Sequence, residues 1–154
     1  MGGQEFARVL GHTRPTKVLT AETSGIAPAL ATATALSIPV VFARKHAPLT
    51  MNGTTVRELA ISRTHEHTVE LLVSSDYMTP QDRILIVDDF LATSQTIQAL
   101  IRLVEKSGAE LVGIGAVIEK SFEGGRRALD CVDIPIVSLV VITSMDDGRI
   151  VFQE

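Results

Sequence analysis

The sequence predicts an α/β domain whose largely parallel, twisted β-sheet is flanked by helices. Short continuous apolar runs such as Val40–Ala43 and Ile84–Val87 are typical of strands that are buried on both faces. These runs alternate with segments of helical periodicity, which favours parallel strands joined by helical crossovers. The 154 residues are enough for one domain with a core but short for two. We therefore expect residues 1–154 to form a single domain.

The first elements follow from apolar runs and their end signals. Lys17–Ala21 (KVLTA) is a short apolar run and predicts a strand. The next segment, IAPALATATAL, predicts a helix, with Ser24 as its N-cap and Pro28 acceptable in the first turn. The Ser-Ile-Pro sequence after it ends that helix, and Val40–Ala43 predicts a second buried strand.

A hairpin is expected in the middle of the chain. The segments VRELAIS (56–62) and HTVELLVSS (67–75) alternate roughly with a period of two, as half-buried strands do. A polar loop with an Asn52-Gly53 turn signal precedes them.

The second half continues the alternation of strand and helix. Ile84–Val87 predicts a third buried strand, and a helical face follows at Ile97, Leu100, Ile101 and Val104. Gly108 is placed to end this helix. Leu111–Glu119 predicts a fourth strand in which two glycines, Gly113 and Gly115, are points of close packing; Ile134–Thr143 and Arg149–Phe152 predict a terminal hairpin.

Composition excludes several classes of protein. The formal net charge of −4 indicates no nucleic-acid or membrane partner held by bulk charge. No apolar run reaches the length of a membrane span and no signal peptide is evident, so we expect a cytoplasmic protein. The single cysteine, Cys131, excludes an intrachain disulfide and is expected to be a small buried apolar residue.

The functional signal lies in residues 84–96, ILIVDDFLATSQT. Asp88 and Asp89 follow a buried strand, and ligands of parallel sheets bind beyond the carboxyl ends of the strands. Ala92–Thr96 then opens a helix, whose N-terminal N–H groups and hydroxyl side chains suit a phosphate. Together these features predict a sugar-phosphate site. The alternative is an ordinary strand end followed by an ordinary N-cap.

The same stretch resembles the phosphoribosyl pyrophosphate (PRPP) motif of type I phosphoribosyltransferases. Three further segments are similar to this family: ETSGIAPA (22–29), VVFARKHAPLT (40–50) and GIGAVIEKSFEGGR (113–126). The resemblance runs from about Phe6 to the C-terminus, and is strongest to the bacterial xanthine-type members and next to the adenine-type members. It implies the phosphoribosyltransferase fold and transfer of a phosphoribosyl group from PRPP to a purine base. It also implies a flexible loop or hairpin over the site, which we expect within Ala47–Val73, to exclude water during the reaction.

The resemblance also implies roles for individual residues. Asp88 and Asp89 would hold the ribose hydroxyls. The 5′-phosphate would be bound by Ala92, Thr93, Ser94, Gln95 and Thr96, and the pyrophosphate by a loop of Glu22, Thr23, Ser24 and Gly25, often with a cis peptide in relatives, together with Arg44 and Lys45. Mg²⁺ would be held mainly through PRPP and not directly by the protein, and a homodimer is implied. The alternatives are an N-cap role for Ser24 and a solvated surface pair for Arg44 and Lys45.

Base recognition is assigned by the same likeness. Lys120 resembles the lysine that bonds the 6-oxo group of the purine, and an ammonium only donates, which favours xanthine, guanine or hypoxanthine over adenine. Phe90 or Phe122 would stack on the base, although both are more simply interpreted as core residues. His46 is a further candidate near the pyrophosphate. His65 and His67 share a strand face, but a third metal ligand is not evident.

Two departures from the family pattern bear on function. Ser94 stands where relatives carry glycine, and we expect serine to fit because its φ angle need not be positive. The chain also begins after the N-terminal hood segment that covers the purine in relatives, so we expect that segment to be missing. The alternatives to an oxo-purine enzyme are therefore an adenine phosphoribosyltransferase, a non-catalytic PRPP-binding regulatory protein, or an inactive fragment.

Overall fold

The computed structural model describes residues 2–46, 54–61, 68–146 and 148–153. The α-helices and strands along the chain are α1 (Gly2–Leu10), β1 (Lys17–Ala21), α2 (Ile26–Leu36), β2 (Val40–Ala43), β3 (Thr55–Ile61), β4 (Thr68–Ser74), β5 (Arg83–Leu91), α3 (Gln95–Ser107), β6 (Glu110–Lys120), β7 (Ile136–Ser144) and β8 (Val151–Phe152). Short 3₁₀ turns lie at Gly11–Thr13, Ser121–Glu123 and Arg127–Leu129. The predicted α/β fold is confirmed.

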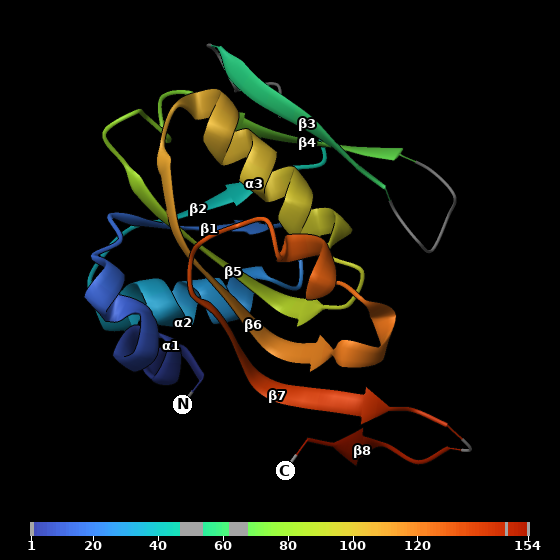
Figure 1. Cartoon of the computed structure of the whole chain (residues 1–154). Helices are drawn as coiled ribbons and strands as arrows, with labels where there is room; N and C mark the ends of the chain where they lie inside the picture. Colours follow the sequence, from blue (N-terminus) through green and yellow to red (C-terminus); the bar gives the residue numbers. More distant parts are fainter. Residues whose placement is uncertain (1, 47–53, 62–67, 147, 154) are drawn as a thin grey trace.

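A six-stranded sheet with the order β2-β1-β5-β6-β7-β8 forms the centre of the molecule (Figure 1). Every neighbouring pair from β2 to β7 is parallel, and β8 pairs antiparallel with β7 as the predicted terminal hairpin. The chain passes from β1 to β2 on one side and later returns to β5 on the other side of β1. This reversal of strand order makes the β1–β5 boundary the topological switch point, where such sheets bind ligands.

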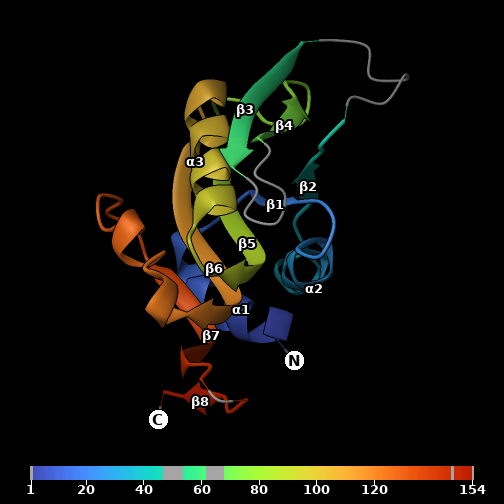
Figure 2. The same cartoon turned by 90° about the vertical axis from the view of Figure 1, so that its right-hand side faces the viewer.

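Helices and a separate hairpin cover the two faces of the sheet. Helices α1 and α2 lie on one face, and α3 with the β3–β4 hairpin lies on the other (Figure 2). Strand β5 alternates between the two cores: Ile84 and Ile86 pack on the α3 side, whereas Leu85 and Val87 pack on the α1–α2 side. Burial on both faces explains why this strand reads as an unbroken apolar run.

Strand β5 is longer than its apolar run. It was predicted to end at Val87, but it continues through Asp88 and Asp89 to Leu91. Backbone pairing with β6 sustains the extension, since Asp88 is opposite Ala116 and Leu91 is opposite Glu119. The acidic pair therefore lies on a strand of the sheet and not on a loop.

Helix α2 has the predicted bounds, Ile26–Leu36, and the end of α3 was also predicted correctly; the N-cap of α2 was predicted wrongly, and α1 was not predicted. Helix α3 ends at Gly108, whose φ of 76° is the left-handed conformation that glycine adopts without steric cost. Ser24 does not cap α2, because the N-cap is Gly25 and no side chain bonds the first turn. Helix α1 was not predicted; it packs so closely on α2 that a Cβ on Gly3 would lie 2.4 Å from the carbonyl carbon of Ala31.

The β3–β4 hairpin is fastened to the rest of the structure through both of its strands. Arg44, just after β2, exchanges two 2.9 Å backbone hydrogen bonds with Leu72 of β4. On the other side, the Glu58 carboxylate accepts from Arg102 at 2.9 Å and from Lys106 at 3.1 Å, both on α3. These contacts hold the two strands of the predicted hairpin against α3. The connections at 47–53 and 62–67, including His65 and His67, lie outside the described residues.

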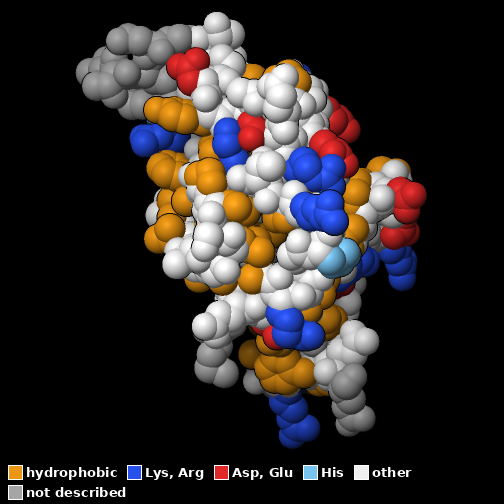
Figure 3. Space-filling view, turned by 90° about the vertical axis from the view of Figure 1, so that its left-hand side faces the viewer, with side chains coloured by type: hydrophobic (Ala, Val, Ile, Leu, Met, Phe, Trp, Pro, Cys, Tyr) orange, Lys and Arg blue, Asp and Glu red, His pale blue; other side chains and the backbone are white. Residues whose placement is uncertain are grey.

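The surface contains one further correction. Cys131 was expected to be buried, but it is exposed, in the turn between Arg127–Leu129 and β7. On the face drawn in Figure 3, basic and acidic side chains are interspersed among apolar ones. Among the described residues, no helix is both long and apolar enough to cross a membrane.

Substitution of Gly115 tests the packing of α1 on the sheet. A Cβ at this position would lie 2.8 Å from the ring of the fully buried Phe6, so Gly115→Ala should lower the free energy of unfolding by about 1–3 kcal/mol. Gly113→Ala is the matched control, since its Cβ would lie 3.2 Å from the movable end of Leu85. Urea unfolding of both variants measures the difference, and equal losses would contradict the close contact with Phe6.

Candidate functional site

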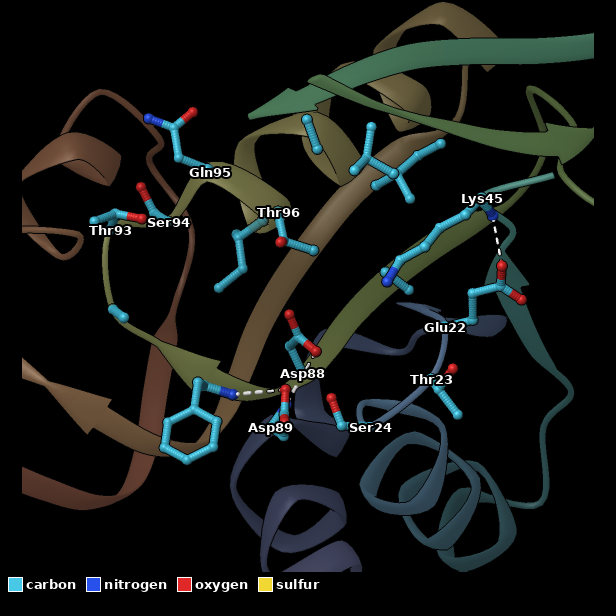
Figure 4. A pocket seen from close by; sticks show the side chains of 17 residues that line it. Glu22, Thr23, Ser24, Lys45, Asp88, Asp89, Thr93, Ser94, Gln95 and Thr96 are labelled. Atoms are coloured by element: carbon cyan, nitrogen blue, oxygen red, sulfur yellow. Dashed lines mark hydrogen bonds between the residues drawn. The ribbon is translucent and has the colours of Figure 1, made fainter. Parts of the chain in front are cut away.

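A cavity of about 340 Å³ opens at the carboxyl ends of β1 and β5 (Figure 4). The segment after β1 forms one side and the segment from β5 into α3 forms the other, with Asp88 and Asp89 between them. The lining residues are Ala21, Glu22, Thr23, Ser24, Lys45, Ala60, Val69, Leu71, Asp88, Asp89, Phe90, Ala92, Thr93, Ser94, Gln95, Thr96 and Ile97. Most of the residues singled out from the sequence therefore meet in one place.

The two aspartates have different environments. Asp88 is 5% exposed and Asp89 is half-buried, although both line the cavity. Each carboxylate accepts the backbone N–H of the following residue at 3.0 Å. Burial, and next the charge of Asp89, raise the pKa of Asp88 to about 7. A buried carboxyl of this kind is available to accept hydrogen bonds from a bound ligand.

The segment after β1 is held by its neighbours. Its Glu22–Thr23 peptide is cis. The Glu22 side chain accepts the backbone N–H of Lys45 at 2.6 Å, and the Lys45 side chain reaches into the cavity toward the aspartates (Figure 4). Gly25 allows the turn to lie directly on the strands, because a Cβ there would come within 2.4 Å of both Thr20 Oγ1 and Asp88 Oδ1.

The segment Ala92–Thr96 leads from β5 into the first turn of α3. Helix α3 begins at Gln95, and the residues of its first turn line the cavity. The backbone N–H groups of this turn have no partner within the helix. Positive helix dipole and free N–H groups together suit a phosphate. Ser94 precedes the helix with φ 66° and ψ 9°, which is the left-handed region. The expectation that serine needs no positive φ here was wrong.

A carbonyl of this segment is held by a residue that the sequence did not indicate. The backbone N–H of Gly125 donates to Ala92 O at 2.8 Å, across 33 positions of sequence. Gly124 and Gly125 are visible as a pair of glycines, but no local pattern could identify a partner so far along the chain. Ala60, Val69 and Leu71 lie on the hairpin that was expected over the site within Ala47–Val73, and they line the cavity. The sequence indicated this segment but not these three residues, because they reach the cavity through the docking of the hairpin on α3.

The three residues that were assigned to purine binding, Phe90, Lys120 and Phe122, lie near the carboxyl ends of β5 and β6. Phe90 lines the cavity and is 43% exposed, and Lys120 Nζ lies 5.3 Å from the centroid of its ring. Lys120 Nζ is also 3.8 Å from Glu123 Oε1. Phe122 is 49% exposed. Neither phenylalanine is a core residue, so the simpler interpretation of both was wrong.

Other candidates lie apart from the cavity lining. The Arg44 guanidinium is 5.0 Å from the centroid of the Phe42 ring, and His46 is exposed; neither is among the lining residues. Within the described part of the chain, no three His, Cys, Asp or Glu side chains are grouped to hold a metal ion. The carboxylates of Asp88 and Asp89 are oxygen donors of the type that Mg²⁺ accepts, usually together with water and substrate phosphates.

Comparison with known proteins agrees with this arrangement. Residues 6–143 match the sequence profile of a protein family, the phosphoribosyl transferase domain. A xanthine phosphoribosyltransferase of Deinococcus deserti is 47% identical over 146 residues, which are 95% of this chain and 76% of that protein. One from Moorella thermoacetica is 46% identical over 150 residues, covering 97% of this chain and 76% of the relative.

Solved structures show the same fold. The adenine phosphoribosyltransferase of Thermoanaerobacter pseudethanolicus superposes with a TM-score of 0.79 at 28% identity, over 91% of this chain and 78% of that one. The enzyme of Giardia lamblia, solved with 9-deazaadenine, gives a TM-score of 0.81 at 23% identity, over 91% and 77%. By sequence and by fold, this chain belongs to the phosphoribosyl transferase domain family.

Proposed function

We propose that this chain is a purine phosphoribosyltransferase of nucleotide salvage. It would transfer the 5-phosphoribosyl group of PRPP to an oxo purine, with xanthine as the preferred base and guanine and hypoxanthine as related ones. One observation carries the proposal: two loops remote in sequence, Glu22–Ser24 and Ala92–Thr96, flank the carboxylates of Asp88 and Asp89 in one cavity. That spacing of anion-binding loops around carboxylates matches a sugar with a phosphate group at each end. The names of its relatives support the same reaction.

The reaction breaks the bond between ribose C1 and the pyrophosphate oxygen and forms a bond from C1 to a purine nitrogen. Pyrophosphate leaves with the electron pair, and the purine nitrogen loses a proton. Because C1 becomes positively charged as the bond breaks, the protein acts mainly by positioning and electrostatics. In its ionised form, Asp88 accepts hydrogen bonds from the ribose hydroxyls, and its charge stabilises the developing cation.

The other residues of the site bind the two phosphate-bearing ends of PRPP, the 5′-phosphate and the pyrophosphate. The first turn of α3 and the hydroxyls of Thr93 and Thr96 bind the 5′-phosphate. Lys45 and the turn Glu22–Gly25 bind the pyrophosphate, and Arg44 remains a predicted second cation. Mg²⁺, with PRPP oxygens and water as its expected direct ligands, would offset the charge of the leaving group. A homodimer is also part of this proposal.

Lys120 favours an oxo purine. Its ammonium can donate to a 6-oxo group but cannot accept from a 6-amino group, and it already lies against the exposed face of Phe90. Adenine is the second candidate base, because the two solved structures compared above are adenine phosphoribosyltransferases. A protein that binds PRPP without turnover is the alternative from another functional class.

Turnover with four bases separates these possibilities. The chain is incubated with Mg²⁺ and PRPP against xanthine, guanine, hypoxanthine and adenine in parallel, and nucleotide formation is measured. We expect nucleotide from an oxo purine and a fall of roughly 100-fold or more in kcat for Asp88→Asn. Turnover with adenine alone would favour the second base, and PRPP binding without product from any base would contradict the enzymatic proposal.

Base recognition is tested with two lysine variants. Lys120→Met keeps the length of the side chain but removes its donor, so kcat/KM for xanthine should fall roughly 10- to 100-fold while KM for PRPP changes little. Lys45→Met should show the opposite pattern, with a raised KM for PRPP. Steady-state kinetics with each substrate varied in turn gives both constants. An equal effect of the two variants on both substrates would contradict the assignment.

Asp88 should reduce the stability of the ligand-free protein at neutral pH. Its pKa of about 7 in the folded state exceeds the ordinary carboxyl value of 3.8, so stability falls as pH rises from about 4 to 7 and stays low above that. At pH 8 Asp88→Asn should raise the free energy of unfolding by up to about 4 kcal/mol. Near pH 5 the gain should be much smaller.

Thermal unfolding of the ligand-free protein at pH 5 and pH 8 measures this dependence. Asp130→Asn, at an exposed position away from the cavity, is the control and should leave the pH dependence unchanged. Asp89→Asn should weaken the pH dependence in part, because the charge of Asp89 contributes to the raised pKa of Asp88. A stabilisation by Asp88→Asn that does not grow with pH would show that its carboxyl is not the source of the effect.

A further inference from the structure

We infer that Gly125 and Arg126 position the loop Ala92–Thr96, so that they set affinity for the 5′-phosphate without touching it. The inference rests on the proposed function and deepens it. Arg126, Glu119 and Ser138, together with Gly125, are called the loop clamp below. The clamp connects the phosphate loop to β6 and β7, two neighbouring strands of the central sheet.

The first contact of the clamp is between Gly125 and the loop backbone. In addition to the 2.8 Å hydrogen bond from Gly125 N to Ala92 O, the Cα of Gly125 lies directly against the loop. A Cβ there would lie 2.2 Å from Ala92 O and 2.9 Å from Ser94 N. Both are backbone atoms, which cannot move without displacing the loop itself. Glycine is therefore required at this position by space and not by its φ angle.

The second part of the clamp is an ion pair between half-buried Arg126, next to Gly125, and the buried carboxylate of Glu119. The neighbouring Arg126 forks onto the Glu119 carboxylate with Nε and Nη2, and donates to Ile136 O at 2.8 Å and to Ser138 Oγ at 3.0 Å. Glu119 is 4% exposed and also accepts from Ser138 Oγ at 2.6 Å. Burial alone would raise the pKa of Glu119, but the bonds from Arg126 and Ser138 hold it below its ordinary value. The carboxylate is thus charged and paired.

The loop needs such support because of its backbone conformation. Ser94 has φ 66°, a left-handed conformation that costs a non-glycine residue on the order of 1 kcal/mol or more. A residue of this kind keeps its conformation only where its surroundings impose it. Gly125 packs on Ser94 N, and Gln98 Nε2 donates to Ser94 Oγ at 3.0 Å. The clamp thus contacts the loop at Ser94, the residue whose backbone conformation has the highest steric cost.

The effect should be confined to one end of the substrate. The loop on the pyrophosphate side is held by other contacts, namely Glu22 with Lys45 and Gly25 on Thr20. None of these involves the clamp. A disturbed clamp should therefore weaken binding of the 5′-phosphate and leave binding of pyrophosphate unchanged, which a general loss of stability would not do.

Calorimetric titration with two separate probes tests this selectivity. Ribose 5-phosphate reports on the loop Ala92–Thr96, and pyrophosphate with Mg²⁺ reports on the opposite side. For Gly125→Ala we expect a loss of at least 10-fold in affinity for ribose 5-phosphate and less than 2-fold for pyrophosphate. Gly115→Ala is the control, because it disturbs the core against Phe6 without reaching the loop. It should lower stability and leave both affinities unchanged.

Arg126 is tested by the same two titrations. Arg126→Gln, with Glu119→Gln added where the single variant does not fold, should reproduce the selective loss. Arg126→Lys should recover it only in part, because an ammonium cannot make the two parallel bonds of the guanidinium. Arg127→Gln, at the exposed neighbouring position, should leave both affinities as they are. In turnover, the Arg126 variants should raise KM for PRPP more than they lower kcat.

The outcomes are distinguishable from a failure of the proposed function. If Gly125→Ala keeps its affinity for ribose 5-phosphate, or loses affinity equally for both probes, the positioning role is overturned. The proposed function still stands in that case, provided that the unaltered protein binds both probes. If the unaltered protein binds neither probe, the proposed function is overturned, and the role of the clamp is overturned with it.

Discussion

Parallel pairing of β1 with β5 is the constraint on which the rest of the site depends. The two strands are 62 positions apart, yet their backbones pair from Lys17 opposite Ile84 to Leu19 opposite Ile86. Because parallel strands end at the same edge, the turn after β1 and the acidic pair of β5 meet across a few ångströms. Burial of Ile84–Val87 on both faces fixes the register, since a slip of one residue would exchange the two cores.

Two aspartates near the two ends of β5 have pKa values that are shifted in opposite directions by their surroundings. Asp82, just before the strand, accepts from Lys17, Thr16 and the Thr79 backbone, and these bonds outweigh burial to lower its pKa to about 2. Asp88, near the opposite end, has Asp89 as its charged neighbour, and burial raises its pKa to about 7. The Thr20 hydroxyl, which crowds the same side of Gly25, has no hydrogen-bond partner within the described residues. Asp82, at the end of β5 away from the cavity, is thus ion-paired with Lys17, whereas the buried carboxyl of Asp88 lines the cavity.

The anion-binding side of the cavity is likewise maintained by contacts outside it. Ser94 keeps its left-handed backbone between Gln98, on the same helix, and Gly125, which β6 holds through the Glu119–Arg126 pair. The hairpin that supplies Ala60 and Leu71 is held against α3 by the hydrogen bond that Arg102 of α3 donates to Glu58 of β3. Residues that line the cavity are thus positioned by ion pairs that lie outside the cavity lining.

The sequence by itself determined the strands, the two main helices, the terminal hairpin and the residues at the strand ends. These depend on local patterns: apolar runs for buried strands, a 3.6-residue period for α3, and glycine at the end of that helix. It also indicated the phosphate loop, because the strand, acidic pair and helix start are contiguous. The tertiary structure alone decided which strands are neighbours, that β5 continues through Asp88 and Asp89, and that Ser94 has a positive φ. It also placed Phe90, Phe122 and Cys131 at the surface and Gly125 against Ala92. Each of these depends on contacts between residues distant in sequence, and such contacts leave no periodic signal in the local sequence.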